Sequence, residues 1–433
     1  MKKAISYMLA FFIFISTVSI SWTPVGSAGA DTSGAFDVSL YNSDIKSMRN
    51  YLLEPNGNVK MKNSCTPEID AFDLVLSRRK FEEARRSDTP YKSVSNVIEK
   101  YDKIDPAFQA DEYDTRRLIV QGFKQLDFSD YKYIEEIIEG NDYLYIVQFG
   151  RNGDTDKDKE MEAERDRCFD ELQPNVEYIE HDLYIKCNID ITDPALQSGD
   201  EFWGREEMGA DDFESYIKSE GIKSEVTIAI IGSGAVETKL LENRFSNKLT
   251  ELKEDSEEGL GTLLAETIAK CTPGLANNIK IFPITSFGDY DEPSVSQTIL
   301  AVPYAAARAD IILLPVAFYK SDILEKAITK AINDKGIIVI AAAGEKEETG
   351  ENVVKFTAAG MEDVIVVGAV NMDGYSIYNA NFGTTIDVAA PGVGIPGINR
   401  KGKPNSYNGS MFSAAYIAAV AAMIKLVLHP ARN

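Results

Sequence analysis

Residues 226–231 read VTIAII, a run of mostly apolar, branched residues that decides the fold class of the chain. Four similar runs follow it, namely IKIFPI at 279–284, DIILLPV at 310–316, GIIVIAAA at 336–343 and VIVVGAV at 364–370. Strands without alternating polar residues are buried on both faces, which is typical of a parallel sheet covered by helices. We therefore predict a doubly wound α/β domain over residues 203–433, with functional groups at the carboxyl ends of its strands.

The first of these strands ends in Gly232, Ser233 and Gly234, a turn that also occurs in dinucleotide-binding folds. Such a site needs a third glycine where this chain has Glu237, whose carboxylate would repel the pyrophosphate. The chain also has two histidines and no CxxC pair, so a zinc site is not indicated. We predict no cofactor and no metal.

Further motifs follow the turn in a fixed order. They are LGTLLAET at 260–267, AAAGE at 341–345, NFG at 381–383, DVAAPG at 387–392 and YNGSMFSAAYIA at 407–418. Taken together with the Gly-Ser-Gly turn, this series resembles the sequence blocks of the subtilisin-like serine peptidases, or subtilases. The resemblance extends from Trp203 to Ile424 and implies a fold of subtilisin type.

The catalytic positions of those blocks carry other residues here. The resemblance places Gly232 where the family has the aspartate that orients the base, Leu260 at the histidine base and Met411 at the nucleophilic serine. Glu345 stands where an asparagine amide donates to the oxyanion, and an ionised carboxylate cannot donate. Acyl transfer by a hydroxyl needs a base, a group that orients it and oxyanion donors. The resemblance therefore implies a fold of subtilisin type without the family's acyl-transfer chemistry.

The substrate-binding strand is altered as well. In the family this strand ends in Ser-Leu-Gly-Gly, whereas residues 315–318 of this chain are PVAF. Pro315 has no N–H to give to a substrate strand, and Phe318 would fill space that a glycine leaves open. We expect weak or changed recognition of peptides in the family's manner.

Ser410 is the other hydroxyl that comes into question, because a slip of one residue would make it the nucleophile. It would find no base, since His181 belongs to the preceding domain and His429 to the C-terminal tail. We expect Ser410 to be a small polar residue before the final helix, and His181 a surface residue at the end of a strand.

The region before the α/β domain predicts a small α+β domain at residues 112–188, with strands near 118–120, 143–149 and 176–185 around a helix at 156–172. The segments RLIV at 117–120 and PNVEYIEHD at 174–182 resemble the family's propeptide, a module that assists folding and inhibits the active site. A polar linker at residues 189–202 follows it.

The N-terminus has the three parts of a secretory signal at residues 1–30: Lys2 and Lys3, an apolar run from Ala4 to Ile20, and a small-residue exit at 28–30. We predict secretion to the extracellular space or cell envelope, with no stable membrane span after cleavage. The alternative is an uncleaved anchor, because about 17 apolar residues approach the length that spans a bilayer. Residues 31–110 form a polar extension without recognisable chemistry.

The net charge bears on the class of partner, and the cysteine content bears on disulfide formation. The net charge of −23, from 68 acidic against 45 basic residues, argues against a nucleic-acid partner, whose phosphates would be repelled. In an exported protein Cys65, Cys168, Cys187 and Cys271 could form up to two disulfides or remain buried thiols.

Three hypotheses follow. The first is a secreted pseudopeptidase that binds a peptide or protein, such as an active subtilase, in a regulatory or scaffolding role. The second is a serine endopeptidase with a rearranged site. The third is an inhibitor or folding helper that acts through residues 112–188 on an active subtilase in trans.

Overall fold

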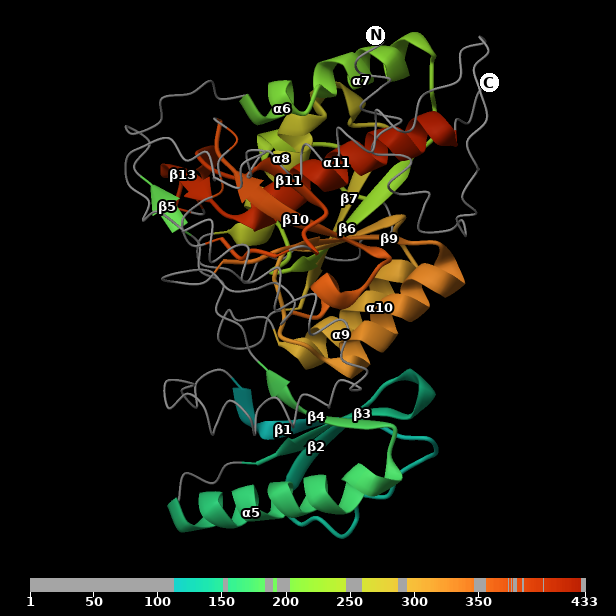
Figure 1. The fold of residues 1–433 in the computed structure, drawn as a ribbon, viewed down its shortest axis with the longest axis vertical. Coiled ribbons are helices and arrows are strands. Elements are labelled where there is room, and N and C mark those ends of the chain that lie inside the picture. Colours follow the sequence, from blue (N-terminus) through green and yellow to red (C-terminus); the bar gives the residue numbers. More distant parts are fainter. Residues whose placement is uncertain are drawn as a thin grey trace, which may run out of the picture.

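The structure is a computed structural model that describes residues 113–150, 155–183, 190–192, 203–246, 259–286, 294–345, 356–372, 374, 376, 380–383, 385–399 and 401–429. The predicted signal segment, the extension at 31–110 and most of the linker lie outside these residues. The described chain forms an N-terminal domain, residues 113–183, and a C-terminal domain, residues 203–429 (Figure 1).

The C-terminal domain is built on a six-stranded sheet in which all neighbouring strands run parallel. The strand order is β11-β10-β9-β8-β6-β7. The strands are β6 (Val226–Gly232), β7 (Ile279–Thr285), β8 (Ile311–Leu314), β9 (Ile338–Ala342), β10 (Val364–Val370) and β11 (Val388–Pro391). Strands β6 to β10 coincide with the five apolar runs, which confirms the predicted α/β class with a parallel sheet.

Helices cover both faces of this sheet (Figure 1). One face carries α6 (Trp203–Glu207), α7 (Ala210–Ser219), α8 (Leu260–Cys271) and α11 (Ser410–Leu428), and the other carries α9 (Val295–Ala306) and α10 (Asp322–Lys335). Successive residues of β6 supply both cores, because Ile228 and Ile230 pack in the first and Ala229 and Ile231 in the second. This two-sided burial explains why the strand sequence does not alternate.

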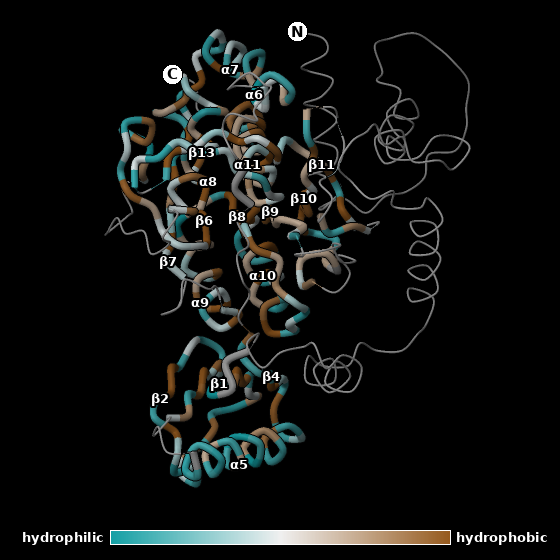
Figure 2. The backbone as a smooth tube through the Cα atoms, turned by 90° about the vertical axis from the view of Figure 1, so that its left-hand side faces the viewer, coloured by the Kyte–Doolittle hydropathy of each residue, from teal (hydrophilic) through white to brown (hydrophobic). Residues whose placement is uncertain are grey.

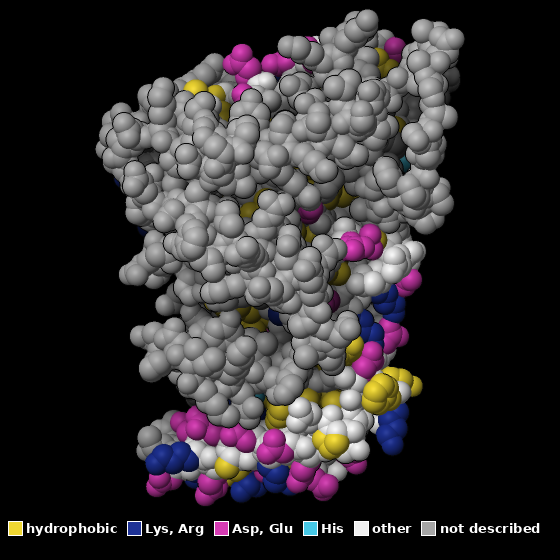
Figure 3. Space-filling view, viewed as in Figure 1, with side chains coloured by type: hydrophobic (Ala, Val, Ile, Leu, Met, Phe, Trp, Pro, Cys, Tyr) yellow, Lys and Arg dark blue, Asp and Glu magenta, His cyan; other side chains and the backbone are white. Residues whose placement is uncertain are grey.

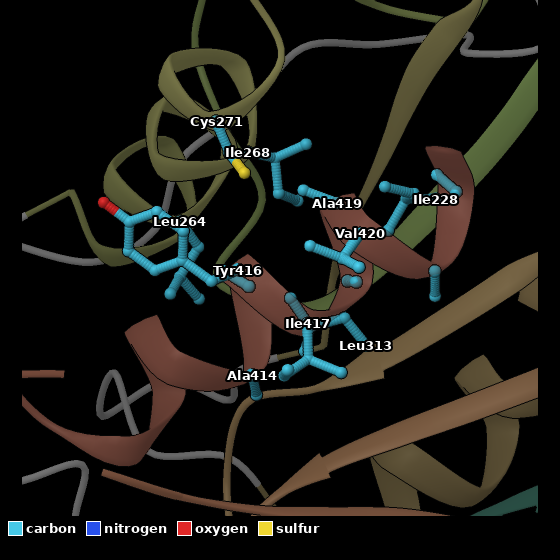
Figure 4. Packing of buried hydrophobic residues seen from close by; sticks show 14 of the residues in the cluster. Ile228, Leu264, Ile268, Cys271, Leu313, Ala414, Tyr416, Ile417, Ala419 and Val420 are labelled. Carbon is cyan, nitrogen blue, oxygen red and sulfur yellow. The ribbon is translucent and has the colours of Figure 1, made fainter. Parts of the chain in front are cut away.

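Helix α11 runs through the middle of the first layer. Its small residues allow close packing, with Tyr416 beside Leu264 of α8 and Ile417 beside Leu313 of β8 (Figure 4). Within the described residues it is the one helix long and apolar enough to cross a membrane, yet 83% of its apolar window is buried in the protein. This burial is that of a core helix of the domain.

Two of the four cysteines lie in the described part of the chain. Cys168 in the N-terminal domain and Cys271 at the end of α8 are both buried free thiols. Burial raises the pKa of each thiol to about 12. They are therefore packing residues in the thiol form at neutral pH, and Cys65 and Cys187 lie outside the described residues.

The N-terminal domain is an antiparallel sheet of order β2-β3-β1-β4. Its elements are β1 (Tyr113–Gln121), β2 (Ile134–Glu139), β3 (Leu144–Phe149), α5 (Thr155–Leu172) and β4 (Tyr178–Leu183). Helix α5 covers one face of the sheet and is mainly hydrophilic (Figure 2). Acidic and basic side chains mix along this outer edge of the molecule (Figure 3). The edge strand β2 was not predicted, because its sequence IEEIIE lacks strand alternation.

The other face of this sheet lies against α9 and α10 of the C-terminal domain (Figures 1 and 2). Ile119, Leu144 and Leu183 pack into the same hydrophobic core as the residues of those two helices. Two ion pairs border the contact, Lys326 with Glu177 at 2.5 Å and Lys330 with Asp142. The two domains are therefore joined by a mixed apolar and charged interface.

His181 corrects one expectation, because it is not a surface residue at the end of a strand. It lies within β4, and its ring stacks on Phe169 of α5 with 5.2 Å between ring centroids and 8° between planes. Burial lowers its pKa to about 4, and Arg165 acts in the same direction while Asp166 opposes it. The half-buried imidazole is therefore neutral at pH 7 and packs against α5.

Acid should destabilise the N-terminal domain through this residue. The pKa in the folded domain lies below the ordinary value of 6.5, so the stabilising effect is complete above pH 6.5 and is lost as pH falls through about 4. Thermal unfolding measured at pH 7.5 and at pH 4 should show that this group lowers the free energy of unfolding by about 2 to 3 kcal/mol at the lower pH. His181→Phe keeps a stacking ring but cannot titrate, so its acid-induced loss should be smaller by that amount. Equal acid sensitivity of both proteins would exclude His181 as the cause.

Candidate functional site

Gly232 and the turn after it lie at the carboxyl end of β6, as the sequence predicts. A Cβ atom built on Gly232 would meet nothing closer than Pro315 Cγ at 3.7 Å. The hydroxyl of Ser233 accepts a hydrogen bond of 2.9 Å from the backbone N of Gly261. A side chain at 261 would collide with Gly234 O, which lies 1.8 Å from the Cβ position. The turn is thus held tightly to the start of α8, while position 232 could carry a Cβ atom without a close contact.

Leu260 is the first residue of α8, and its side chain is 1% exposed. It belongs to the large core cluster between the sheet and the first helix layer. Met411 lies in the first turn of α11, is 4% exposed and belongs to the same cluster. Both positions are therefore occupied by packing residues that carry no group able to transfer a proton.

Glu345 follows strand β9 and faces the start of α11. Its carboxylate Oε1 accepts a hydrogen bond from the backbone N of Ser410. The hydroxyl of Ser410 in turn accepts a bond of 2.9 Å from the backbone N of Gly344. Ser410 itself is 0% exposed. The two segments therefore hold each other by a reciprocal pair of bonds, in which the serine hydroxyl is an acceptor inside the protein.

The turn that carries Glu345 is fixed from its other side by Asn381. The side-chain Nδ2 of Asn381 donates to Ala343 O at 2.8 Å, and its backbone N donates to Gly344 O at 3.0 Å. Gly344 has φ of +79°, and a Cβ there would lie 2.7 Å from Ala317 Cβ. Glycine is required at this position by its backbone conformation and by close packing.

The altered substrate strand continues from β8. Phe318 is 5% exposed, and its carbonyl accepts a bond of 2.8 Å from the backbone N of Thr357. The next residue, Tyr319, stacks on Phe356 with 5.1 Å between ring centroids. Residues 316–318 are all buried. The Phe318 side chain thus occupies interior space, and its backbone is already paired with another segment of the chain.

Part of the predicted linker lies beside the segment that leads into α11. Strand β5 (Asp190–Thr192) pairs antiparallel with β13 (Pro404–Asn408), which pairs on its other side with β12 (Ile395–Ile398). In this register Asp190 lies opposite Asn408, just before the glycine that precedes α11. The chain's own backbone therefore covers the edge of β13 next to the start of α11.

Two buried carboxylates of β4 are functional residues that the sequence analysis missed. Glu180 accepts hydrogen bonds from the Ser321 hydroxyl at 2.7 Å and from two backbone amides in the first turn of α10 at 2.8 and 3.3 Å. Asp182 accepts from the backbone N and hydroxyl of Ser296 in α9, at 2.9 and 2.5 Å. Each carboxylate of the N-terminal domain thus caps one helix of the C-terminal domain.

Both carboxylates are almost completely excluded from solvent. Burial raises the pKa of Glu180 to about 7, although its hydrogen bonds act in the opposite direction. Asp182 lies 3.7 Å from a guanidinium nitrogen of Arg117. The sequence does hold a signal for this pair, because acidic residues two positions apart in an otherwise buried strand need partners, which free helix N-termini supply.

In the part of the chain that the structure describes, neither histidine lies near the start of α11. His181 lies in the N-terminal domain and His429 ends α11 at the opposite end from Ser410. Among the residues that the structure describes, no group of three or more His, Cys, Asp and Glu side chains could hold a metal ion. The Glu345 carboxylate contacts Ser410 at its backbone N, whereas the Ser410 hydroxyl accepts from Gly344 N.

A family model for the Subtilase family matches residues 223–431. Subtilisin-like protease 2 of Pseudogymnoascus destructans is 25% identical over 261 residues, which cover 58% of this chain and 64% of that protein. A cuticle-degrading serine protease of Arthrobotrys oligospora is 24% identical over 242 residues, covering 51% of this chain and 56% of its own length. The chain thus spans less than two thirds of these relatives.

A thermophilic serine proteinase of a Bacillus species is 31% identical over a shorter stretch of 153 residues, 35% of this chain and 37% of that protein. Among solved structures, a cold adapted subtilisin-like serine proteinase matches with a TM-score of 0.41 and 21% identity, covering 46% of this chain and 75% of the other. The family match lies on the parallel-sheet domain and includes Gly232, Leu260, Glu345 and Met411. The similarity of this chain to the Subtilase family therefore lies in residues 223–431.

Proposed function

We propose that this chain is a secreted subtilisin-like protein without peptidase activity, which acts by binding a peptide or protein. The proposal rests on the residues that occupy the family's catalytic positions in this chain. Gly232 has no side chain, Leu260 and Met411 are packed in the hydrophobic core, and Glu345 is bound to the first amide of α11. Serine peptidase chemistry needs a nucleophile, a base and oxyanion donors together, and these positions supply none of them.

The contacts of Ser410 argue against a rearranged active site. Its hydroxyl is buried and accepts a bond from Gly344 N. A nucleophile must reach a substrate carbonyl from the surface and must be in contact with a base. Neither histidine of the chain lies in the segments that contact Ser410.

Secretion is part of the same proposal. It rests on the three-part signal at residues 1–30 and is supported by the similarity to a protease named for degrading cuticle, that of Arthrobotrys oligospora. The partner we propose is a peptide or protein, and an active subtilase is one such partner. The high negative charge makes nucleic acid an unfavourable partner.

A mass measurement tests the proposal. The full chain expressed without an added protease should keep its N-terminal domain covalently attached, because self-cleavage needs a working site. Intact mass spectrometry should therefore show no cut between residues 183 and 203. A fluorophosphonate probe should not label Ser410. Self-cleavage in this segment, abolished by Ser410→Ala but not by Ser406→Ala, would establish the rearranged peptidase instead.

A second candidate function, inhibition or folding assistance in trans, is favoured by one feature of the domain interface. Glu180 and Asp182 bind backbone amides and serine hydroxyls at helix starts. Contacts to backbone groups do not depend strongly on the partner's sequence, so another subtilase with equivalent helices could accept the same domain. Inhibition of an active subtilase by residues 112–188, lost on Glu180→Ala, would support this function.

A further inference from the structure

The start of α11 lacks a capping side chain of its own. The residue before the helix is Gly409, which makes no side-chain bond to the first turn. The first amides of a helix have no acceptor within the helix, and the positive end of the helix dipole favours an anion there. An acceptor must therefore come from outside the helix, and Glu345 provides one at Ser410 N.

The carboxylate is positioned closely by its surroundings. A Cβ atom on Gly409 would lie 3.7 Å from Glu345 Oε2 and 3.5 Å from Met411 Cγ. Glu345 also pairs with Ala380 in an isolated antiparallel bridge, and the turn before it is held by Asn381. The carboxylate therefore lies over the start of α11 on a backbone that is fixed on both sides.

We propose that Glu345 is an internal anion that permanently occupies the anion-binding start of α11 and fastens the loop after β9 to that helix. The inference rests on the proposed function, because it assigns to the family's degenerate oxyanion position a stabilising role in place of a catalytic one. In this chain the Glu345 carboxylate takes the place that an anion from solution would otherwise occupy at the start of α11. A small carboxylate from solution can take the same place once the side chain is removed.

Chemical rescue tests this inference on the full chain. Glu345→Ala should lower the melting temperature by about 4 to 8 °C, because a charge-assisted bond and a helix cap are lost. Exchange of chloride for formate at constant ionic strength should restore about half of the loss in a saturable way, as expected for a ligand that binds only the folded state. The unmodified chain should show no formate-specific shift, since its site is filled.

Two further variants make the result decisive. Glu345→Gln keeps the shape and the acceptor oxygen but loses the charge. Its melting temperature should lie between those of the other two proteins and should not change with formate. Glu362→Ala removes an exposed acidic residue and should cause neither the loss nor the response. The inference is overturned if Glu345→Ala melts like the unmodified chain, or if formate stabilises all variants equally or none. Peptide turnover by the unmodified chain would instead refute the proposed function, and it is measured separately.

Discussion

Leu260→His should destabilise the C-terminal domain by about 3 to 5 kcal/mol, although it restores the residue type that the family carries at this position. Leu260 is 1% exposed and packs within the main core. Substitution removes buried apolar contacts and places a polar ring where Gly232 offers no carboxylate to orient it. Guanidinium unfolding of both proteins at pH 8, where the imidazole is neutral, measures the loss.

Two further variants separate the loss of buried apolar contacts from the effect of a histidine that no carboxylate orients. Leu260→Met keeps the apolar volume and should cost less than about 1.5 kcal/mol. Gly232→Asp added to Leu260→His should recover about 1 to 2 kcal/mol if the new carboxylate binds the imidazole, since a Cβ atom at 232 meets nothing closer than Pro315 Cγ at 3.7 Å. A well-tolerated histidine in the single variant would contradict our view that Leu260 is a core residue.

The sequence was most informative where local pattern and burial coincide. The five apolar runs became parallel strands because both faces of each strand are covered, as β6 shows with alternate residues in two cores. The first of these runs likewise placed Gly232 at the end of a strand. These are local properties, so a single sequence contains them.

The parts that could not be predicted depend on contacts between distant segments. The bond between Glu345 and Ser410 joins residues 65 positions apart, and Glu180 reaches a helix start 141 positions away. His181 was misjudged because a polar residue in a short strand gives no sign of the helix that will cover it. In each case the contacts of the polar side chain depend on a partner elsewhere in the fold. The pattern of apolar residues in the sequence indicates only which positions are buried.

Packing around the compared positions depends on contacts that do not involve proton transfer. Glycines at 261, 344 and 409 are required by close contacts or backbone conformation around the site. Gly232 has no comparable close contact. The described scaffold around these positions is therefore constrained by packing and backbone conformation at glycines that carry no titratable group.

Replacement of both interdomain carboxylates should release the N-terminal domain from α9 and α10. In Glu180→Ala with Asp182→Ala, five hydrogen bonds to the two helix starts are lost, and donors that were paired at a buried interface are left without acceptors. We expect the docking free energy to weaken by about 4 to 6 kcal/mol, which corresponds to an opening constant at least about a thousandfold larger. The domain would remain tethered but undocked for much of the time.

Hydrogen exchange in the intact chain measures this opening. Amides in the first turns of α9 and α10 should lose protection in the double variant, while those of β6 and α11 keep it, because only the interface has opened. Measurements at pH 8 keep Glu180 ionised, since its pKa lies at about 7. Glu177→Gln is the matched control, because its ion pair with Lys326 is partly exposed and should contribute less than about 1 kcal/mol. If the double variant exchanged like the control, the apolar contacts of Ile119, Leu144 and Leu183 would suffice to hold the domains together.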